Sequence, residues 1–580
     1  MAFSRTADRA FVPGIVRWIC LGPFLLSRLI CFGQTSGPGF ESDDQKTIHG
    51  TVVNSVTRAP IARALVHSGD DRLAMLTDGD GHFEFTLSNV DKSANGSDFR
   101  SLNRSRLSLP GEANGLWLSA RKPGFLDDPS SGRPVEAIPG SEVTIPLVPE
   151  AVIAGKVNES AGDVAVGVNV EIFFRQVRDG IARWTPRGSA RTDSTGEFRF
   201  AELQPGTYKL ATQEWMDSDP VTRIPGAQDF GFPPVYYPGA PDFSAAAPID
   251  LAAGQTFSAS LSLNRQPYYA VKIPVADDGT KGGMNIRVSP QGQRGPGYSL
   301  GYNPGTHVIA GSLPNGNYLV EALRSGPESE SGAVNLKVAG ATLEGPAMTL
   351  SRNVSIGFEV KEEFNDTSQR ATGIWSDGRH TFQLQGPRSY FFPRLEPTDD
   401  FGQGGGQIRP PRGPDDDSVV LENVPPGRYW LRLNAGRGYV ASASMAGVDL
   451  LREPLVVGLG STSPIEIRLR DDGAELDGTV AGVGASSLGG GAVQRQAWVY
   501  CVPLPDGLGQ FQQLEFSGDG KFTLAMLAPG GYRVMAFSSP QPEIPYRDAE
   551  AMRAYENKGQ VIHLGAGQKA TVQLEVISGN

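Results

Sequence analysis

The sequence predicts an all-β protein, a tandem array of about five antiparallel β-sandwiches with one short helix near the C-terminus. Three observations predict this class. Glycine and proline make up a fifth of the 580 residues, against about 12% in an average protein, and both disfavour long helices. Short runs alternate apolar and polar residues, as half-buried strands require. Two turn-and-strand signatures recur at a spacing of about 107 residues, which fits small β-sandwich units.

The first signature is a proline–glycine turn followed by an aromatic strand. A degenerate version lies in residues 109–120, where Trp117 is near the aromatic position. The four clear copies are LQPGTYKL, LPNGNYLV, VPPGRYWL and APGGYRVM, with Tyr208, Tyr318, Tyr429 and Tyr532.

The second signature is a glycine turn followed by a strand of alternating residues, and it has the same period. Its copies begin near Gly140, Gly254, Gly340, Gly460 and Gly567. Two independent markers with one period predict five units behind a leader. The predicted boundaries are 1–33 for a signal peptide, then 34–149, 150–265, 266–352, 353–471 and 472–580 for β-sandwiches 1 to 5.

Three stretches interrupt the strand pattern. Residues 88–115 and 400–417 are rich in small, polar and charged residues and are predicted to be mobile surface loops. Residues 546–559 carry Ala, Met and Tyr at helical spacing, and Gly559 can end a helix there. This is the one short helix that we expect.

The N-terminus has the pattern of an export signal. Arginines precede the apolar stretch 18–27, and small residues lead to a cleavage site after Gly33. The alternative is a permanent membrane anchor, although Pro23 and Arg28 shorten the apolar run below the roughly 20 residues that a spanning helix needs. We therefore predict no stable membrane span after signal removal, and an extracytoplasmic location in the periplasm, on the outer surface or secreted.

Charge and cysteine content indicate which partners and which cellular compartment the sequence favours. The net charge is −11, and no basic run is present to recruit nucleic acid or an anionic membrane. Cys20 and Cys31 lie in the leader, which leaves Cys501 alone in the remainder. A single thiol makes no internal disulfide and no thiolate zinc cluster, so packing must provide the stability. This pattern favours a bacterial envelope protein.

Acidic and histidine residues suggest turns more strongly than metal sites. The segment 77–85 (TDGDGHFEF) is echoed at 192–200 and 517–524, and Asp-Gly is typical of hairpin turns. A calcium loop around Asp78 is the alternative, but it would lack ligands. A metal site of histidines from the first unit is a second alternative. No nucleophile elbow, phosphate loop or CxxC pair is present. We predict no catalytic, cofactor-binding or metal-binding residues, and no enzyme.

The segment 214–243 is unusually rich in aromatic residues set among prolines. Prolines hold extended conformations that could present rings to solvent, where flat rings stack on the apolar faces of sugars. The alternative is that these rings cap the end of the second sandwich as an ordered loop. The predicted carbohydrate-binding residues are Trp215, Phe232, Tyr236 and Tyr237.

The order of motifs in 48–85, IHGTVV…APIARALV…TDGDGHFEF, returns in 153–210 and resembles the carboxypeptidase regulatory-like domain. The segment 235–263 is similar to a linker strand, and the tail 499–574 to the C-terminal part, of large exported proteins of Acidobacteria-type bacteria built from such domains. The resemblance implies immunoglobulin-like or transthyretin-like sandwiches without catalysis, in a fold grouped with carbohydrate-binding domains.

The function we expect is that of an exported, non-enzymatic multidomain protein that binds carbohydrate or another cell-envelope component. The alternative is a structural or adhesion scaffold that contacts protein partners at the cell surface through sheet edges and loops. Its expected partner is a glycan or an envelope protein.

Overall fold

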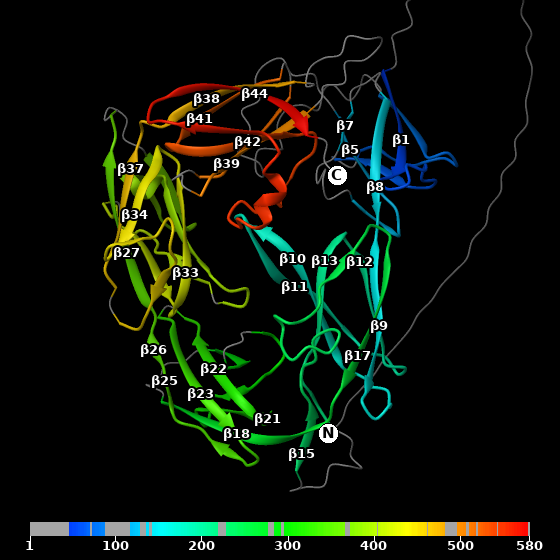
Figure 1. Ribbon diagram of the computed structural model, residues 1–580, viewed down its shortest axis with the longest axis vertical. Helices are drawn as coiled ribbons and strands as arrows, with labels where there is room; N and C mark the ends of the chain where they lie inside the picture. Colours follow the sequence, from blue (N-terminus) through cyan, green and yellow to red (C-terminus); the bar gives the residue numbers. More distant parts are fainter. Residues whose placement is uncertain are drawn as a thin grey trace, which may run out of the picture. The chain divides into compact units, whose positions relative to one another are not determined.

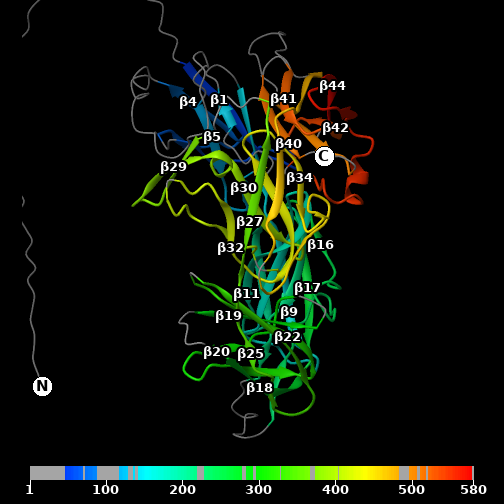
Figure 2. The same ribbon diagram turned by 90° about the vertical axis from the view of Figure 1, so that its left-hand side faces the viewer.

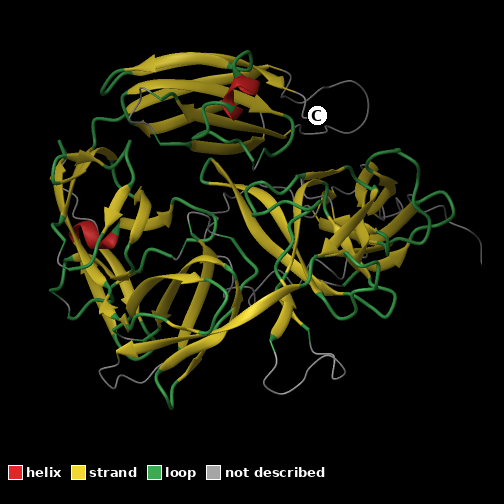
Figure 3. Cartoon of the chain, turned by 60° about the horizontal axis from the view of Figure 1, so that its bottom comes forward, coloured by secondary structure: helices red, strands yellow, loops and turns green. Residues whose placement is uncertain are grey.

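The described part of the chain consists mainly of β-strands (Figures 1 and 3). The strands form five successive sets, each around its own hydrophobic core. We call these sets modules 1 to 5. The all-β class is confirmed, whereas the leader 1–33 and the loop 88–115 lie outside the described residues. The computed structural model describes residues 46–577 except 70–71, 88–115, 128–134, 138–141, 218–227, 277–282, 292–294, 327, 366–371, 403, 414, 461, 482–495, 506–509, 518–519 and 542.

Module 1 is a sandwich of two sheets, ordered β4-β1-β8-β6 and β3-β2-β5-β7. Its core lies between the sheets and includes Ile48, Val66, Leu118 and Ile145. The strands are β1 (Lys46–Asn54), β2 (Leu65–Ser68), β3 (Ala74–Leu76), β4 (His82–Leu87), β5 (Leu116–Arg121), β6 (Phe125–Asp127), β7 (Val135–Ala137) and β8 (Glu142–Pro149).

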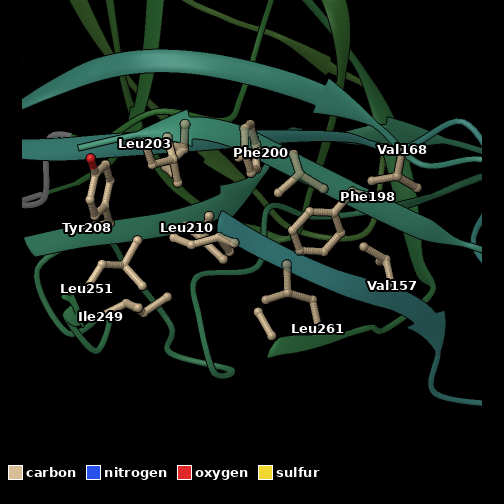
Figure 4. Close-up of a cluster of buried hydrophobic side chains, with 14 of the residues drawn as sticks. Val157, Val168, Phe198, Phe200, Leu203, Tyr208, Leu210, Ile249, Leu251 and Leu261 are labelled. Atoms are coloured by element: carbon tan, nitrogen blue, oxygen red, sulfur yellow. The ribbon is translucent and has the colours of Figure 1, made fainter. Parts of the chain in front are cut away.

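Module 2 has the sheets β12-β9-β17 and β11-β10-β13-β16. Phe198, Phe200, Tyr208 and Leu261 gather in its core, as Figure 4 shows. The strands are β9 (Ala151–Glu159), β10 (Asn169–Arg178), β11 (Ile181–Arg191), β12 (Glu197–Leu203), β13 (Gly206–Thr212), β16 (Ile249–Leu251) and β17 (Thr256–Leu263).

Module 3 has the sheets β14-β15-β18-β21-β20, with β24 and β25 also paired to β18, and β19-β22-β23-β26. Strands β14 (Trp215–Met216) and β15 (Asp229–Phe232) lie in the chain between β13 and β16 of module 2, but they belong to this sheet of module 3. The others are β18 (Gln266–Ala276), β19 (Met284–Pro290), β20 (Gly301–Asn303), β21 (Val308–Pro314), β22 (Gly316–Arg324), β23 (Glu330–Val338), β24 (Leu343–Glu344), β25 (Met348–Thr349) and β26 (Ser351–Arg352).

Module 4 has the sheets β31-β32-β27-β37-β34-β35 and β30-β33-β36, and a separate hairpin of β28 and β29. Its elements are β27 (Val354–Glu363), β28 (Thr372–Ser376), β29 (Thr381–Gln385), the 3-10 helix η2 (Gly386–Ser389), β30 (Phe391–Pro397), β31 (Gln407–Ile408), β32 (Val419–Val424), β33 (Gly427–Ala435), β34 (Tyr439–Met445), β35 (Val448–Asp449), β36 (Leu455–Val457) and β37 (Ile465–Arg470).

Module 5 has strands ordered β40-β39-β42-β44-β38-β41, with β43 paired to β42. Its elements are β38 (Ala474–Ala481), β39 (Gln496–Pro503), β40 (Gln512–Ser517), β41 (Lys521–Leu527), β42 (Gly530–Phe537), the 3-10 helix η3 (Ala551–Tyr555), β43 (Gln560–Leu564) and β44 (Lys569–Ile577).

One connection is common to the five modules. In modules 1, 2, 4 and 5 the first strand pairs in parallel with the last strand, and in module 3 β18 pairs in parallel with β24 and β25, just before the last strand β26. Nearly all other pairings are antiparallel. A parallel neighbour has to be reached by a crossover rather than a hairpin, so each unit closes on itself before the next begins. The parallel pairs are β1–β8, β9–β17, β18–β24, β27–β37 and β38–β44.

The repeated tyrosines explain the first sequence signature. All four are buried, and each phenol donates a hydrogen bond to the backbone carbonyl of the residue four positions earlier. This bond satisfies a buried carbonyl at the turn that enters the strand. In module 1 Leu118 is fully buried in β5, whereas Trp117 is 38% exposed, so Trp117 does not take the tyrosine's place. The donor–acceptor distances are 2.7 Å (Tyr208), 3.0 Å (Tyr318), 2.9 Å (Tyr429) and 2.6 Å (Tyr532).

A glycine opposite a phenylalanine distinguishes modules 1, 2 and 5. In module 2 Gly155 is the cross-strand partner of Phe198, and a Cβ at Gly155 would lie 2.6 Å from that ring and 2.2 Å from the Ala259 carbonyl oxygen. Only glycine lets the ring lie flat over the strand. The same pairing, with similar close approaches, occurs at Gly50–Phe83 and Gly478–Phe522.

The predicted helix 546–559 is much shorter in the structure. It is a 3-10 helix of five residues, Ala551–Tyr555, flanked by turns. Tyr546, Met552 and Tyr555 pack against a second buried cluster of module 5 that includes Tyr500 and Phe537. Packing on a broad sheet, rather than helix propensity, determines this segment.

The predicted loop 400–417 also differs from the expectation, because its side chains contact other parts of the protein. Phe401 lies edge-on to Phe243, 4.9 Å between ring centroids, and joins the cluster of Phe173 and Tyr236 on module 2. Arg409 contacts Asp416 at 3.1 Å further along.

Candidate functional site

The aromatic segment 214–243 begins where the chain leaves β13 and adds β14 and β15 to the sheet of β18. Trp215 and Phe232 are cross-strand partners, and their rings stack with centroids 5.0 Å apart and planes at 21°. Gly231, the cross-strand partner of Met216, must be glycine, because a Cβ there would lie 2.9 Å from the Tyr268 ring and 3.0 Å from the Met216 sulfur. In the strand order β14 is the edge strand, so Trp215 lies at the margin of the sheet.

The four predicted carbohydrate-binding rings do not form one surface. Phe232 is 2% exposed and Tyr236 is 3% exposed, so neither offers a ring face to a ligand in this structure. The Tyr236 phenol donates to the Pro296 carbonyl at 2.6 Å. Trp215 and Tyr237 are half-buried and pack against the core of module 2. For Phe232 and Tyr236 the structure thus favours the alternative of an ordered cap, because the hydrophobic effect places their rings against the neighbouring cores.

Polar groups surround Trp215. The Glu214 carboxylate accepts hydrogen bonds from the Ser299 hydroxyl at 3.2 Å and from its backbone N–H at 3.4 Å. Asp217 accepts two bonds from the Arg265 guanidinium, at 3.0 and 2.8 Å. That guanidinium lies 4.0 Å over the Phe230 ring. We call Glu214, Trp215, Asp217, Phe230 and Arg265 the Trp215 patch.

Burial perturbs the acid next to Trp215. Oε2 of Glu214 and the phenol of Tyr268 are buried and have no hydrogen-bond partner among the described residues. Desolvation raises the pKa of Glu214 to about 7, against the ordinary glutamate value of 4.5. Desolvation, followed by the nearby charge of Glu214, also raises the pKa of Tyr268. Glu214 is therefore a group whose charge changes near neutral pH.

A second group of rings lies on the hairpin of β28 and β29 in module 4. Trp375 and Phe382 are cross-strand partners whose planes differ by 11°, with centroids 5.8 Å apart, and His380 is parallel to Phe382 at 6.2 Å. Figure 2 shows β29 projecting away from β27 and β30. Sequence reasoning missed this site, although the alternating pattern of 372–385 around a central Asp-Gly was a usable signal.

The segments 77–85 and 192–200 form turns, but these turns do not make hairpins, and residues 518–519 of the third segment lie outside the described residues. One carboxylate oxygen of Asp78 accepts from the backbone N–H of Asp80 at 2.9 Å and of His82 at 2.8 Å, and Gly81 has φ of 76°. Asp193 makes the same turn. Strands β3 and β4 belong to different sheets, so the turn crosses between sheets and the hairpin interpretation is wrong.

The structure gives no support to the two metal alternatives. Among the residues it describes, no three His, Cys, Asp or Glu side chains are grouped as a metal ion requires. His82 instead contacts the Thr51 hydroxyl at 2.9 Å, and His49 lies 3.6 Å from Glu84. Cys501 is fully buried, and desolvation raises the pKa of its thiol to about 12, so it is unreactive near neutral pH.

In the part of the chain that is described, none of the helices is long and apolar enough to span a bilayer.

Comparison with known proteins gives structural likeness only. No family model matches the chain, and no curated protein matches it. A candidate carbohydrate-binding protein from Pseudomonas aeruginosa is 18% identical, with a TM-score of 0.13, over 20% of this chain and 89% of that one. A streptococcal ancillary pilin is 11% identical, with a TM-score of 0.17, over 52% of this chain and 98% of that one. A shaft pilin from Lactobacillus rhamnosus GG is 12% identical, with a TM-score of 0.17, over 38% and 97%.

Proposed function

We propose that the chain is an exported, non-enzymatic β-sandwich scaffold that binds carbohydrate at the Trp215 patch, outside the cytoplasm. The observation that carries the proposal is a half-buried indole on an edge strand, with the hydrogen-bonded carboxylates of Glu214 and Asp217 close to it in the chain. Sugars are recognised by a flat apolar face together with a few fixed polar groups. Phe232 behind the indole and the Arg265–Asp217 pair beside it hold these groups in place. The resemblance to regulatory-like domains adds an argument by analogy.

The test is a glycan array probed with the labelled full chain. We expect binding that Trp215→Ala reduces at least about tenfold, because the stacking face is lost. Trp117→Ala is the matched control, since Trp117 is a 38% exposed tryptophan in another module. Asp217→Asn removes a charge without opening the core and should also weaken binding. Absence of any glycan signal from the intact chain contradicts the proposal.

A second candidate function is a scaffold that contacts protein partners. The exposed β28–β29 hairpin favours it, because unpaired strand edges bind other strands. Retained partner binding in the Trp215→Ala variant would separate this function from carbohydrate binding.

A further inference from the structure

The hairpin of β28 and β29 is a sheet of two strands with both outer edges unpaired. Five residue pairs join the strands, from Thr372–Gln385 to Ser376–Thr381, and neither strand pairs with any other described strand. An isolated two-stranded hairpin is only marginally stable in water, and open edges attract further strands. This hairpin therefore has unused hydrogen-bonding groups on both outer edges.

The edges lack the usual protection against strand addition. Proteins guard exposed edges with charged residues or proline, yet the sequences TGIWS and TFQLQ contain neither. Ile374, in the middle of β28, is 80% exposed. The tip is well ordered, because the Asp377 carboxylate accepts from the backbone N–H of Arg379 at 2.7 Å and of His380 at 2.6 Å. A strand that added to this hairpin would meet a preformed edge.

The two faces of the hairpin have different chemistry. The base of one face lies against η2, where a Cβ at Gly373 would be 3.3 Å from the Ser389 Cβ. That face also carries the parallel rings of Trp375 and Phe382, with centroids 5.8 Å apart. The opposite face exposes Ile374 and polar residues such as Gln383. The feature that both faces share is the open backbone edge of each of the two strands.

We propose that the β29 edge pairs in antiparallel fashion with the β29 edge of a second copy of this chain. The sequence TFQLQ is self-complementary in that pairing when Gln383 lies on the two-fold axis. Thr381 then faces Gln385 of the second copy, and Phe382 faces its Leu384, so polar residues meet polar and apolar residues meet apolar. Neither strand carries a charged residue, so two copies do not repel each other at this edge. For the same reason, the edge offers no charge that would favour a charged partner.

The choice of β29 over β28 follows from composition. Both strands alternate between the faces, but β28 contains Gly373, which weakens a strand, whereas β29 contains no glycine. A five-residue contact buries little area, so the dimer is weak, with a Kd above about 10 µM. The inference goes beyond carbohydrate binding and does not depend on it.

The test is sedimentation velocity of the full chain over a range of concentrations. We expect a monomer–dimer equilibrium whose Kd rises at least about tenfold in Gln383→Lys, because two ammonium groups would meet at the axis. Thr372→Lys adds the same charge to the same face on the other strand, and it should change Kd less than about twofold. A circular dichroism melt checks that both variants remain folded.

Cross-linking provides a second measurement that does not depend on a substitution that weakens the dimer. In a chain with Cys20→Ser and Cys31→Ser, Gln383→Cys is expected to give a dimer with a short bis-maleimide, and Thr372→Cys is not; Cys501 is buried and silent. The proposal would be overturned if the chain is a monomer at every concentration, or if Gln383→Lys leaves the dimer Kd unchanged. It would also be overturned if cross-linking occurs at position 372 alone. Association only with glycan present would also overturn it.

Discussion

Two segments of this protein carry aromatic rings and differ in how far their apolar side chains are buried. In the segment 214–243, Phe232 and Tyr236 are almost fully buried, whereas the β28–β29 hairpin leaves Ile374 80% exposed. The first segment runs along module 2 and joins β18, and both supply apolar surfaces. The hairpin packs mainly on the short helix η2. Aromatic density in a sequence thus indicates hydrophobic area, but the neighbouring elements decide whether that area faces solvent or core.

The largest expected effect separates the two segments by stability. Phe232→Ala removes a ring that is 2% exposed, so it should lower the unfolding free energy of its module by about 3–5 kcal/mol. Trp375→Ala should cost less than about 1 kcal/mol, because Trp375 is only half-buried and stacks on Phe382 of the same hairpin. Urea unfolding followed by tryptophan and far-UV signals measures both. Equal losses of unfolding free energy in the two variants would contradict the difference in burial between the two segments.

The second effect concerns pH and involves only the first segment. The folded pKa of Glu214 is raised to about 7 from 4.5, so the folded state binds the proton more tightly than the unfolded state. Its contribution to stability is fully present below pH 4.5 and is lost as pH rises through 7, by about 1–3 kcal/mol. Thermal melts between pH 4.5 and 8 test this.

Glu214→Gln supplies the control for the pH experiment. The amide cannot ionise, so the decrease in melting temperature between pH 4.5 and 7 should be smaller in the variant than in the parent chain. An unchanged pH profile would show that other groups are responsible.

A smaller loss of stability is expected when the phenol oxygen of Tyr236 is removed from the buried segment. Tyr236→Phe removes the phenol that donates to the Pro296 carbonyl at 2.6 Å and leaves that carbonyl without this donor. We expect a loss of about 1–2 kcal/mol, since a hydrogen bond is lost while the ring stays packed. The same change at Tyr237, which is half-buried, should have less effect in parallel urea titrations.

The smallest effect on global stability is expected at the hairpin tip. Hydrogen bonds from the backbone N–H groups of His380 and Arg379 lower the pKa of Asp377 to about 2. Its contribution is present above pH 3.8 and is lost as pH falls through 2, so it is constant near neutral pH. Asp377→Ala should leave the global midpoint unchanged but speed hydrogen exchange of the amides of β28 and β29. Unchanged exchange would show that the tip does not depend on this turn.

Much of the fold could be predicted because its signals are local. Pro-Gly turns precede the strands of Tyr208 and Tyr429, and alternating residues follow the second glycine signature. Each such signal depends on the backbone and on a few neighbouring residues. The helix at 546–559 was overestimated, since Tyr546 and Tyr555 pack on the sheet of module 5 instead of forming one helical face.

The candidate site was predictable only in part. The sequence pointed to Trp215 and Tyr237, which do lie at half-buried positions, but it gave the same weight to Phe232 and Tyr236. It gave no weight to Glu214, because a carboxylate is perturbed only when other elements desolvate it. The hairpin had a local signal, but its open outer edges had none, because an edge is known to be unpaired only when all other pairings are known.

The sequence by itself determined the all-β class, the period of the modules and the positions of their turns, because glycine, proline and alternating residues act through local backbone conformation and side-chain direction. Only the tertiary structure decided which rings are buried, that β14 and β15 join the sheet of β18, and that the outer edges of β28 and β29 pair with no other described strand. Those outcomes depend on contacts between residues far apart in the chain, where the burial of apolar surface outweighs any local preference.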